Sequence, residues 1–406
     1  MTQAYKTATG EPPASAALAA RRPYLVALAL ALGAAISLGL ARFSYALLLP
    51  PMRLDLDWSY FLAGSMNTAN ALGYFIGALS MPALMRRWRA QTPLVGGALL
   101  AGVVLMLSGL VVDATVLLLL RVLAGIASAC IFIAGGVLAA RLGALHPDRA
   151  GLLIGIYYGG TGAGISVAAL LVPRVLASAA GAAHPWQWAW VALGALCLAA
   201  TVAMALVAAR IDGAPAAPGA HGQFRIGPFA FGLAGYLMFG VGYIAYMTFV
   251  IALLKEQGMG AATITWFYAA LGMAVMASSR IWAGMLDRFK GGQSMAILNA
   301  LLGLATILPA LTAWPPLVFL SGMMFGAIFL SVVASTTALV RHNLPAHAWS
   351  GGISAFTTVF AFGQIIGPAV IGKIADGPGG LQRGLIYSAL ALLVGALLAS
   401  RQRALD

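Results

Sequence analysis

The stretch TVLLLLRVLAGIASACIFIAGGVLAA, residues 115–140, contains a single charged residue, Arg121. A bilayer core of about 30 Å needs roughly 20 helical residues per crossing, so this stretch is long enough to span it as one α-helix. Over the whole chain of 406 residues, 62% are apolar and 8% are charged, whereas a soluble domain is nearer a quarter charged. The composition therefore excludes an ordinary soluble enzyme and indicates an all-α membrane protein in a lipid bilayer.

Eleven further apolar runs of similar length are bounded by charged residues, proline or glycine. With the first stretch they predict twelve transmembrane helices, over residues 24–49, 58–81, 93–112, 115–140, 151–173, 187–209, 228–253, 263–283, 294–312, 315–340, 351–373 and 381–400. The longest connection, residues 210–227, is rich in glycine and proline and is predicted to be a linker. It divides the chain into six-helix bundles at 24–209 and 228–400, with short tails at 1–23 and 401–406.

The two bundles carry traces of an internal repeat. A shift of 201 residues places Gly39–Tyr45 on Gly240–Tyr246, with the glycines and the final tyrosines coinciding. A shift of 200 residues places Arg141 on Arg341. This nearly constant offset predicts two parallel, pseudo-symmetric bundles that rock against each other about a central site.

Lysine and arginine are distributed unequally between the two sides of the predicted bundle. With the amino terminus inside, the cytoplasmic segments hold 16 of these residues and the outer loops hold 5. Basic residues of short loops are retained in the cytoplasm, so both termini of this multi-pass protein are predicted to be cytoplasmic. The net charge of +13 comes from small separated groups with no basic face, so no nucleic acid is expected as a partner.

The fourth run carries a small-residue stripe beside Arg121. Gly125 and Ala129 are four residues apart on one helical face, which lets a neighbouring helix approach closely. This pattern is similar to the Arg-x-x-x-Gly-x-x-x-small motif of major facilitator superfamily transporters. The resemblance covers essentially the whole chain. It implies the twelve-helix major facilitator fold and alternating access for a small-molecule substrate, in a monomer without cofactor, metal or catalytic residues.

Residues 283–290 carry a second motif of this superfamily. They are similar to its loop signature Gly-x-Leu-x-Asp-Arg-x-Gly-Arg-Lys, with Ala283 in place of the first glycine. The resemblance implies that Asp287 and Arg288 belong to a cytoplasmic gate. The corresponding loop after Gly77 keeps a basic cluster but lacks the Asp-Arg pair.

The fifth run is rich in glycine. Gly155, Gly159 and Gly164 follow the spacing of the superfamily's exporter signature, Gly-x-x-x-Gly-Pro-x-x-Gly-Gly, but Gly160 stands where proline is usual. The resemblance favours export over import, although close helix packing accounts for the same glycines.

Three segments together look closest to the bacterial YbfB/YjiJ-type branch of the superfamily. They are residues 39–52, residues 68–74 and residues 363–368, the last of which holds Gly367 and Pro368. These two residues are expected to serve helix packing. The branch implies a location in a bacterial inner (cytoplasmic) membrane, and it implies nothing about the identity of the substrate.

Arg42 and Arg121 are the arginines that fall well inside predicted spans, away from the span ends, and they lie at nearly the same depth from the outer side. An ionised group in lipid costs at least about 2.5 kcal/mol, so both should face protein or a water-filled cavity. No Asp or Glu falls inside a run to neutralise them. The pair therefore predicts a site for a small organic anion and disfavours a cation. In the alternative interpretation, Arg121 binds backbone carbonyls as a coupling residue and Arg42 extends toward the outer surface.

Polar and aromatic residues at similar depth complete the candidate substrate site. They are Tyr45, Asn67, Asn70, Tyr243, Tyr246 and Gln364. The repeat places Tyr243 opposite Arg42 and Tyr246 opposite Tyr45, so one half is expected to supply charge and the other an aromatic wall. Hydrogen bonding between helices, without substrate contact, is the alternative for each of these residues, the tyrosines included.

Two other functions stay open at this point. The methionine and aromatic content of the seventh, eighth and tenth runs suits a broad exporter of hydrophobic compounds. A membrane sensor that binds ligand without moving it is a second alternative. The runs contain no embedded carboxylate or histidine to carry a proton, so uniport and co-transport of a proton with the anion both remain open.

Overall fold

The computed structural model describes residues 22–208, 225–345 and 348–405. The described residues form helices joined by short turns and loops. Most of the predicted tail 1–23 and most of the predicted linker 210–227 lie outside the described residues.

The first half of the chain forms six membrane-length helical stretches. Their elements are α2 (Pro23–Ala34), η1 (Ala35–Phe43), α3 (Tyr45–Asp55), α4 (Tyr60–Arg87), α5 (Gln91–Ser108), α6 (Ala114–Leu145), α7 (Ala150–Ser178) and α8 (Pro185–Ala208). The elements α2, η1 and α3 follow one another as a single stretch, Pro23–Asp55. The middle element η1 is a π-helix, and a short 3₁₀ turn, η2 (Pro147–Arg149), precedes α7.

The second half repeats this arrangement. Its elements are η3 (Gly227–Phe229), α9 (Ala230–Glu256), α10 (Ala261–Ile281), α11 (Ala283–Arg288), α12 (Gln293–Leu311), α13 (Pro315–Asn343), α14 (Trp349–Ala375) and α15 (Gly380–Ser400). Each of the twelve predicted spans coincides with a helical stretch, with ends that differ by a few residues. The predicted all-α, twelve-helix fold is confirmed.

Helix α4 differs from the other membrane-length stretches in hydropathy. Eleven stretches in the described ranges are long and apolar enough to cross a bilayer, and α4 is not among them. Asn67 and Asn70 lower its mean hydropathy, and both side chains are buried. The buried amides of a membrane helix need polar partners inside the protein.

Side-chain caps and prolines set several helix ends. The Ser59 hydroxyl accepts a hydrogen bond from the Leu62 N–H at the start of α4, at 3.1 Å. The Asp113 carboxylate does the same for the Val116 N–H at the start of α6, at 2.9 Å. Pro315 occupies the first position of α13, where its missing N–H costs nothing.

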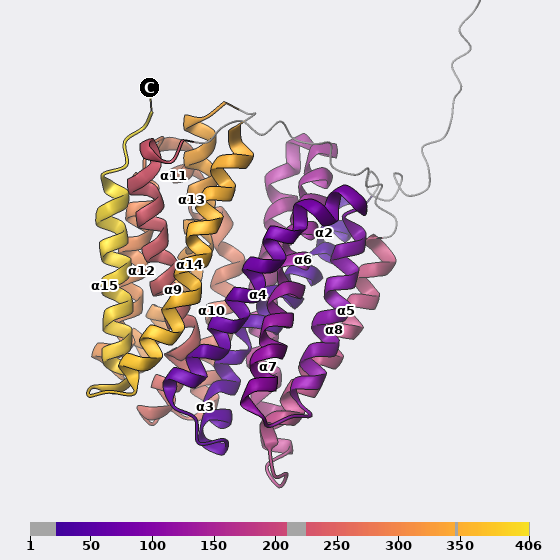
Figure 1. Ribbon diagram of the computed structural model, residues 1–406, viewed down its shortest axis with the longest axis vertical. Coiled ribbons are helices and arrows are strands. Elements are labelled where there is room, and N and C mark those ends of the chain that lie inside the picture. The colour runs from indigo at the N-terminus through magenta and orange to yellow at the C-terminus, as the bar shows by residue number, and fades with distance from the viewer. Residues whose placement is uncertain (1–21, 209–224, 346–347, 406) are drawn as a thin grey trace, which may run out of the picture.

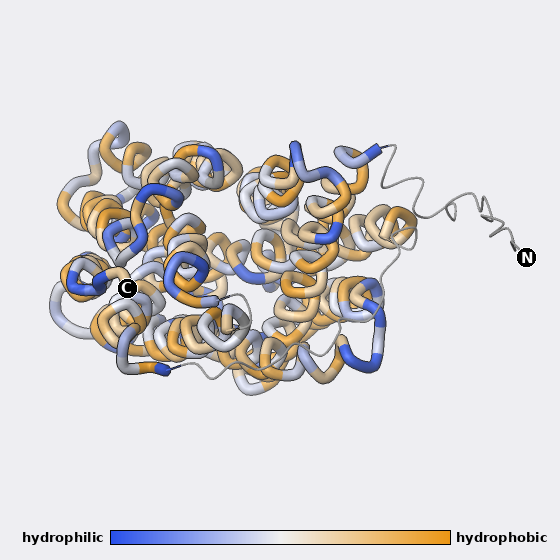
Figure 2. The backbone as a smooth tube through the Cα atoms, turned by 90° about the horizontal axis from the view of Figure 1, so that it is seen from above, coloured by the Kyte–Doolittle hydropathy of each residue, from blue (hydrophilic) through white to orange (hydrophobic). Residues whose placement is uncertain are grey.

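The helices gather into two groups that correspond to the two halves of the chain (Figure 1). Figure 2, which looks along the helices from above, shows hydrophobic walls with hydrophilic residues mainly at helix ends and connections. We call the end of the bundle at which the described chain begins and ends, near Arg22 and Leu405, the terminal end, and the opposite end the distal end.

Small residues bring the two halves together along two seams, α7 with α10 and α4 with α14. A Cβ added at Gly162 would overlap the carbonyl oxygen of Gly272, and one added at Gly64 would overlap that of Pro368. In a bilayer, where apolar surface gains nothing by leaving lipid, such close backbone approach is a main source of helix association.

Hydrogen bonds join the two halves at the distal end. The Asp376 carboxylate, at the end of α14, accepts hydrogen bonds from the backbone N–H of Tyr60 at 2.6 Å and of Phe61 at 3.0 Å. The Tyr60 hydroxyl donates to Glu256 at the end of α9, and the Arg53 guanidinium lies 3.8 Å from the Tyr60 ring centroid. A carboxylate of one half thus caps a helix of the other.

Candidate substrate-binding site

The π-helix η1 carries Arg42. Its widened turn is visible in the hydrogen bond from the Ser44 N–H to the Gly39 carbonyl, five residues earlier, at 3.1 Å. Gly39 lies against Gly164 of α7, where a Cβ on either residue would overlap the other's backbone. This contact fixes η1 in the interior of the protein, and Arg42 is 2% exposed.

Arg42 reaches across the interface between the halves. Its Nη2 donates a hydrogen bond to Oε1 of Gln364 on α14, and the same oxygen accepts a hydrogen bond from the Tyr243 hydroxyl of α9 at 2.7 Å. The guanidinium carbon lies 5.7 Å from the ring centroid of Tyr74 on α4. No described residue accepts a hydrogen bond from the buried Nε. The described hydrogen-bond partner of Arg42 is therefore a neutral amide, and the Nε–H group of Arg42 is left without a described acceptor.

Arg121 is held more fully by the protein. Its Nη1 donates to the Ala41 carbonyl at 2.9 Å and its Nη2 to Oδ1 of Asn67 at 3.3 Å. The guanidinium carbon lies 5.1 Å from the ring centroid of Tyr45 and 5.5 Å from that of Trp190. Its Nε, like that of Arg42, has no acceptor among the described residues. The two guanidinium groups are near enough for their like charges to repel.

The two asparagines of α4 connect Arg121 to its surroundings. Asn67 donates from Nδ2 to the Thr248 hydroxyl of α9 at 2.8 Å, across the interface between the halves. Asn70 donates from Nδ2 to the backbone carbonyl of Arg121 at 3.2 Å. Both amides thus make the hydrogen bonds between helices that their spacing suggested, and Asn67 links Arg121 to the second half.

The two other predicted tyrosines lie apart from Arg42. The Tyr45 hydroxyl donates to the Ala63 carbonyl at 2.9 Å, and its ring stacks on Trp190 and supports Arg121. The Tyr246 hydroxyl donates to Ser321 at 2.7 Å, because the Ser321 proton is used toward the Ala305 carbonyl. The Tyr246 ring stacks on a phenylalanine of α13 at 4.0 Å, so the structure places Tyr246 inside the second half.

The glycines singled out for helix packing differ in how closely they meet a neighbour. A Cβ at Gly125 would overlap the Asn70 carbonyl, and one at Gly367 would lie 2.6 Å from the Val241 carbonyl oxygen. At Gly159 the nearest atom would be 3.8 Å away, an ordinary contact, and Gly155 is half-buried. Pro368 lies inside α14, where its carbonyl meets Gly64.

The predicted gate residues lie at the terminal end, far from the arginines. Asp287 and Arg288 are exposed at the end of α11, and the Arg288 guanidinium carbon lies 5.8 Å from the Phe289 ring centroid. Their gating role stays a prediction.

Three residues of the site did not enter the sequence argument as site residues: Tyr74, Trp190 and Thr248. Trp190 and Thr248 have no charge, and nothing in their spacing ties them to an arginine far away in the sequence. Tyr74 follows Asn67 and Asn70 on α4, one helical turn after Asn70, and this helical register could have identified it.

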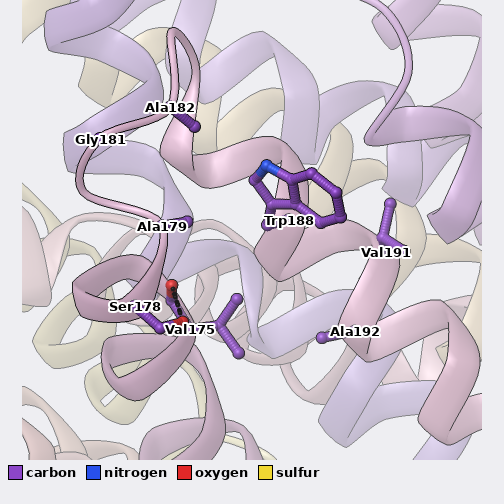
Figure 3. Close-up of a pocket in the computed structure, with 8 residues that line it drawn as sticks. All are labelled: Val175, Ser178, Ala179, Gly181, Ala182, Trp188, Val191 and Ala192. Atoms are coloured by element: carbon purple, nitrogen blue, oxygen red, sulfur yellow. Dashed lines mark hydrogen bonds between the residues drawn. The ribbon is translucent and has the colours of Figure 1, made fainter.

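A groove of the described structure lies elsewhere. It has a volume of about 530 Å³ and is formed by the distal ends of α7 and α8. Figure 3 shows the Trp188 indole beside the turn that contains Ala179 and Ala182. Its walls carry no charged side chain, so this groove offers nothing to recognise a charged or strongly polar ligand.

An ion pair lies at the distal end. The described ion pair joins His184 and Asp55, whose Nδ1 and Oδ2 atoms are 2.6 Å apart. The described residues contain no cluster of three or more histidines, cysteines or carboxylates that could hold a metal ion. The chemistry available at the site is therefore hydrogen bonding and positive charge.

A family model described as "Uncharacterised MFS-type transporter YbfB" matches residues 34–400. No curated protein gives a significant match to the chain. Among solved structures, a mutant of the nucleoside transporter NupG is similar at 15% identity and a TM-score of 0.72, over 92% of this chain and 99% of that chain. A bacterial homologue of the human lysosomal transporter Spinster, inward-facing and occupied, has 15% identity and a TM-score of 0.71, over 97% and 98%. The transporter FucP, outward-facing, has 15% identity and a TM-score of 0.60, over 94% and 99%.

Proposed function

This chain belongs to the YbfB-type family of major facilitator superfamily transporters, and from that premise we propose that it carries a small organic anion, bound first by Arg42. The family makes it a multi-pass membrane transporter. Cargo charge, direction and orientation are the parts that we propose.

The observation that carries the proposal is the uncompensated charge of Arg42. The side chain is 2% exposed, its described partner is the neutral amide of Gln364, and its Nε has no described acceptor. A buried guanidinium without a carboxylate is costly, and a bound anion offsets that cost with charge-assisted hydrogen bonds. A cationic substrate would add to the repulsion.

Arg121 supports this site from behind. Its two terminal nitrogens are committed to Ala41 and Asn67, so it contributes positive potential and holds η1 and α4 in place. We propose that the anionic group of the cargo contacts Arg42 directly, with Tyr243 and Gln364 beside it. Arg121 strengthens binding through the positive potential of its charge.

The orientation follows from the asymmetry of basic residues. With 16 Lys and Arg on one side and 5 on the other, we propose that the terminal end faces the cytoplasm of a bacterial cell and the distal end faces outward. Eight hydrogen bonds between described residues of the two halves lie at mid-depth or at the distal end. We infer that the outward side is the closed one here and that cargo enters from the cytoplasm.

Export is the direction we propose. The glycine-rich stretch of α7 that resembles the exporter signature contains Gly162, which packs against Gly272 of α10 in the other half. This stretch therefore lies on a seam that must rearrange when the halves rock. Uniport and proton co-transport are both compatible with a site that has no described carboxylate.

The test is equilibrium binding with purified full-length protein. A panel of carboxylates, sulfonates, neutral hydrophobic compounds and cationic dyes is screened by thermal shift, since a ligand stabilises in proportion to its occupancy. We expect anions to stabilise the parent, and Arg42→Ala to weaken the best anion by about 2 to 3 kcal/mol, roughly 30- to 150-fold. Arg383→Ala, at an exposed arginine of α15, is the matched control and should bind as the parent does.

The same screen separates the alternative. If neutral hydrophobic compounds stabilise the protein and anions do not, the anion proposal fails. A broad exporter of hydrophobic compounds then becomes the better account.

A further inference from the structure

Aromatic side chains from both halves surround Arg42. On the first-half side, the Tyr74 ring centroid lies 5.7 Å from the guanidinium carbon. On the second-half side, the Tyr243 hydroxyl of α9 donates to the same Gln364 oxygen that accepts from Arg42. Rings of α4 and α9 thus lie beside one arginine.

The second half contributes a wall of parallel rings. Tyr243 stacks on Phe360 at 5.5 Å and 18°, and on Phe329 at 5.9 Å and 8°. Phe239 continues the stack, 4.7 Å from Tyr243 and 5.4 Å from Phe360. The Tyr243 hydroxyl is bound to Gln364, which fixes the ring at the level of Arg42. This hydrogen bond connects the ring stack to the amide that binds Arg42.

Part of this aromatic surface is left uncovered by the protein. Tyr74 and Phe360 are half-buried, although their neighbours Tyr243 and Phe329 are 3% and 2% exposed. Partly buried aromatic rings, together with a guanidinium whose buried Nε has no described acceptor, fit a ligand that is both anionic and aromatic.

We propose that the cargo is an aromatic carboxylate. Its carboxylate takes the free donors of Arg42, and its ring lies against Tyr74 and Phe360. The inference rests on the proposed anion site and adds the class of anion. An aliphatic carboxylate of the same charge would make the polar contacts but would leave the protein rings without a stacking partner. The missing stacking lowers the affinity by about three- to tenfold. A neutral arene would leave the guanidinium unpaired.

The experiment compares matched ligands on the purified, full-length protein. Benzoate and 2-naphthoate carry ring and charge, cyclohexanecarboxylate carries the charge without the arene, and benzamide carries the ring without the charge. We expect benzoate to bind about three- to tenfold more tightly than cyclohexanecarboxylate, and benzamide to bind at least about tenfold more weakly than benzoate.

Two phenylalanine variants locate the selectivity. Phe360→Leu removes a ring of the wall but keeps an apolar side chain, so the benzoate preference should fall toward one. Phe319→Leu is the matched control, because Phe319 packs on Phe267, and the preference should persist there.

The outcomes separate the two proposals. Equal binding of benzoate and cyclohexanecarboxylate overturns the aromatic class and leaves the anion site standing. Equal binding of benzoate and benzamide overturns the anion site itself. If neither benzoate nor 2-naphthoate binds the parent, or if Phe360→Leu and Phe319→Leu retain the same preference, the aromatic class is also overturned.

Discussion

Arg42 and Arg121 are the same side chain at nearly the same depth, yet their surroundings differ. Arg121 uses both terminal nitrogens within its own half, on Ala41 and Asn67, and lies beside two stacked rings. Arg42 makes one hydrogen bond among the described residues, to an amide of the opposite half. A buried charge in a membrane protein can therefore stabilise the fold or bind a ligand. The number of hydrogen-bond acceptors that the protein supplies to the charge distinguishes the two cases.

Removing the better-held arginine should have the largest effect. Arg121→Ala leaves the Ala41 carbonyl and the Asn67 amide oxygen without their donor, and leaves a cavity beside Tyr45 and Trp190. We expect a loss of about 3 kcal/mol or more in the free energy of unfolding, together with loss of transport. Thermal unfolding in detergent and flux in proteoliposomes measure the two effects. A variant that unfolds at the parent's temperature would show that Arg121 does not hold the fold.

A carboxylate placed beside Arg42 should convert it into a protein-held arginine. Gln364→Glu keeps the size of the side chain and supplies the missing counter-charge, so the internal pair competes with any anionic ligand. We expect ligand affinity to fall by about 2 kcal/mol, roughly 30-fold, without loss of unliganded stability. Calorimetric titration checks it, with Gln364→Leu as the uncharged comparison. Undiminished anion binding in Gln364→Glu would contradict direct contact between Arg42 and the cargo.

Lysine variants sharpen the comparison, because lysine keeps the charge but loses the planar fork. Arg42→Lys should bind the anion about tenfold more weakly while its unliganded stability stays near that of the parent. Arg121→Lys should show the reverse pattern, with stability reduced and equilibrium binding largely kept. Binding and unfolding are measured on the same two preparations. Identical profiles for the two variants would remove the distinction between the arginines.

The smallest effect is expected at Tyr246, which the internal repeat placed near the site and the structure places inside the second half. Tyr246→Phe removes the hydrogen bond to Ser321 and should cost about 1 kcal/mol of stability, while ligand affinity stays within about twofold of the parent. Binding and thermal unfolding check both values. Tyr243→Phe is the matched variant, since that hydroxyl lies on Gln364, and it should weaken binding more. A larger loss at Tyr246 than at Tyr243 would reverse this assignment.

The sequence was enough to predict the spans because hydropathy, charge and proline act locally along the chain. It also predicted which arginines would be buried, since the cost of a charge in lipid depends on depth alone. The partner of each arginine could not be predicted in this way. Gln364 lies far from Arg42 in the sequence, and Trp190 reaches Arg121 through packing that no local pattern records. Tyr246 shows the same limit, because a repeat fixes depth but not which way a side chain points.

The π-helix η1 changes how the residues before it and after it are rotated about the axis of the first helical stretch. A π turn closes its hydrogen bond over one residue more than an α turn, and one residue of α-helix turns the chain by about 100°. If η1 rewound as α-helix, the side chains on one side of it would rotate by that angle relative to those on the other. Arg42 lies at the end of η1, so such a rewinding would swing its guanidinium away from Gln364 without moving the axis of the helix. The hydrogen-bond register of this one turn therefore determines whether Arg42 of the first half can bond to Gln364 of the second half.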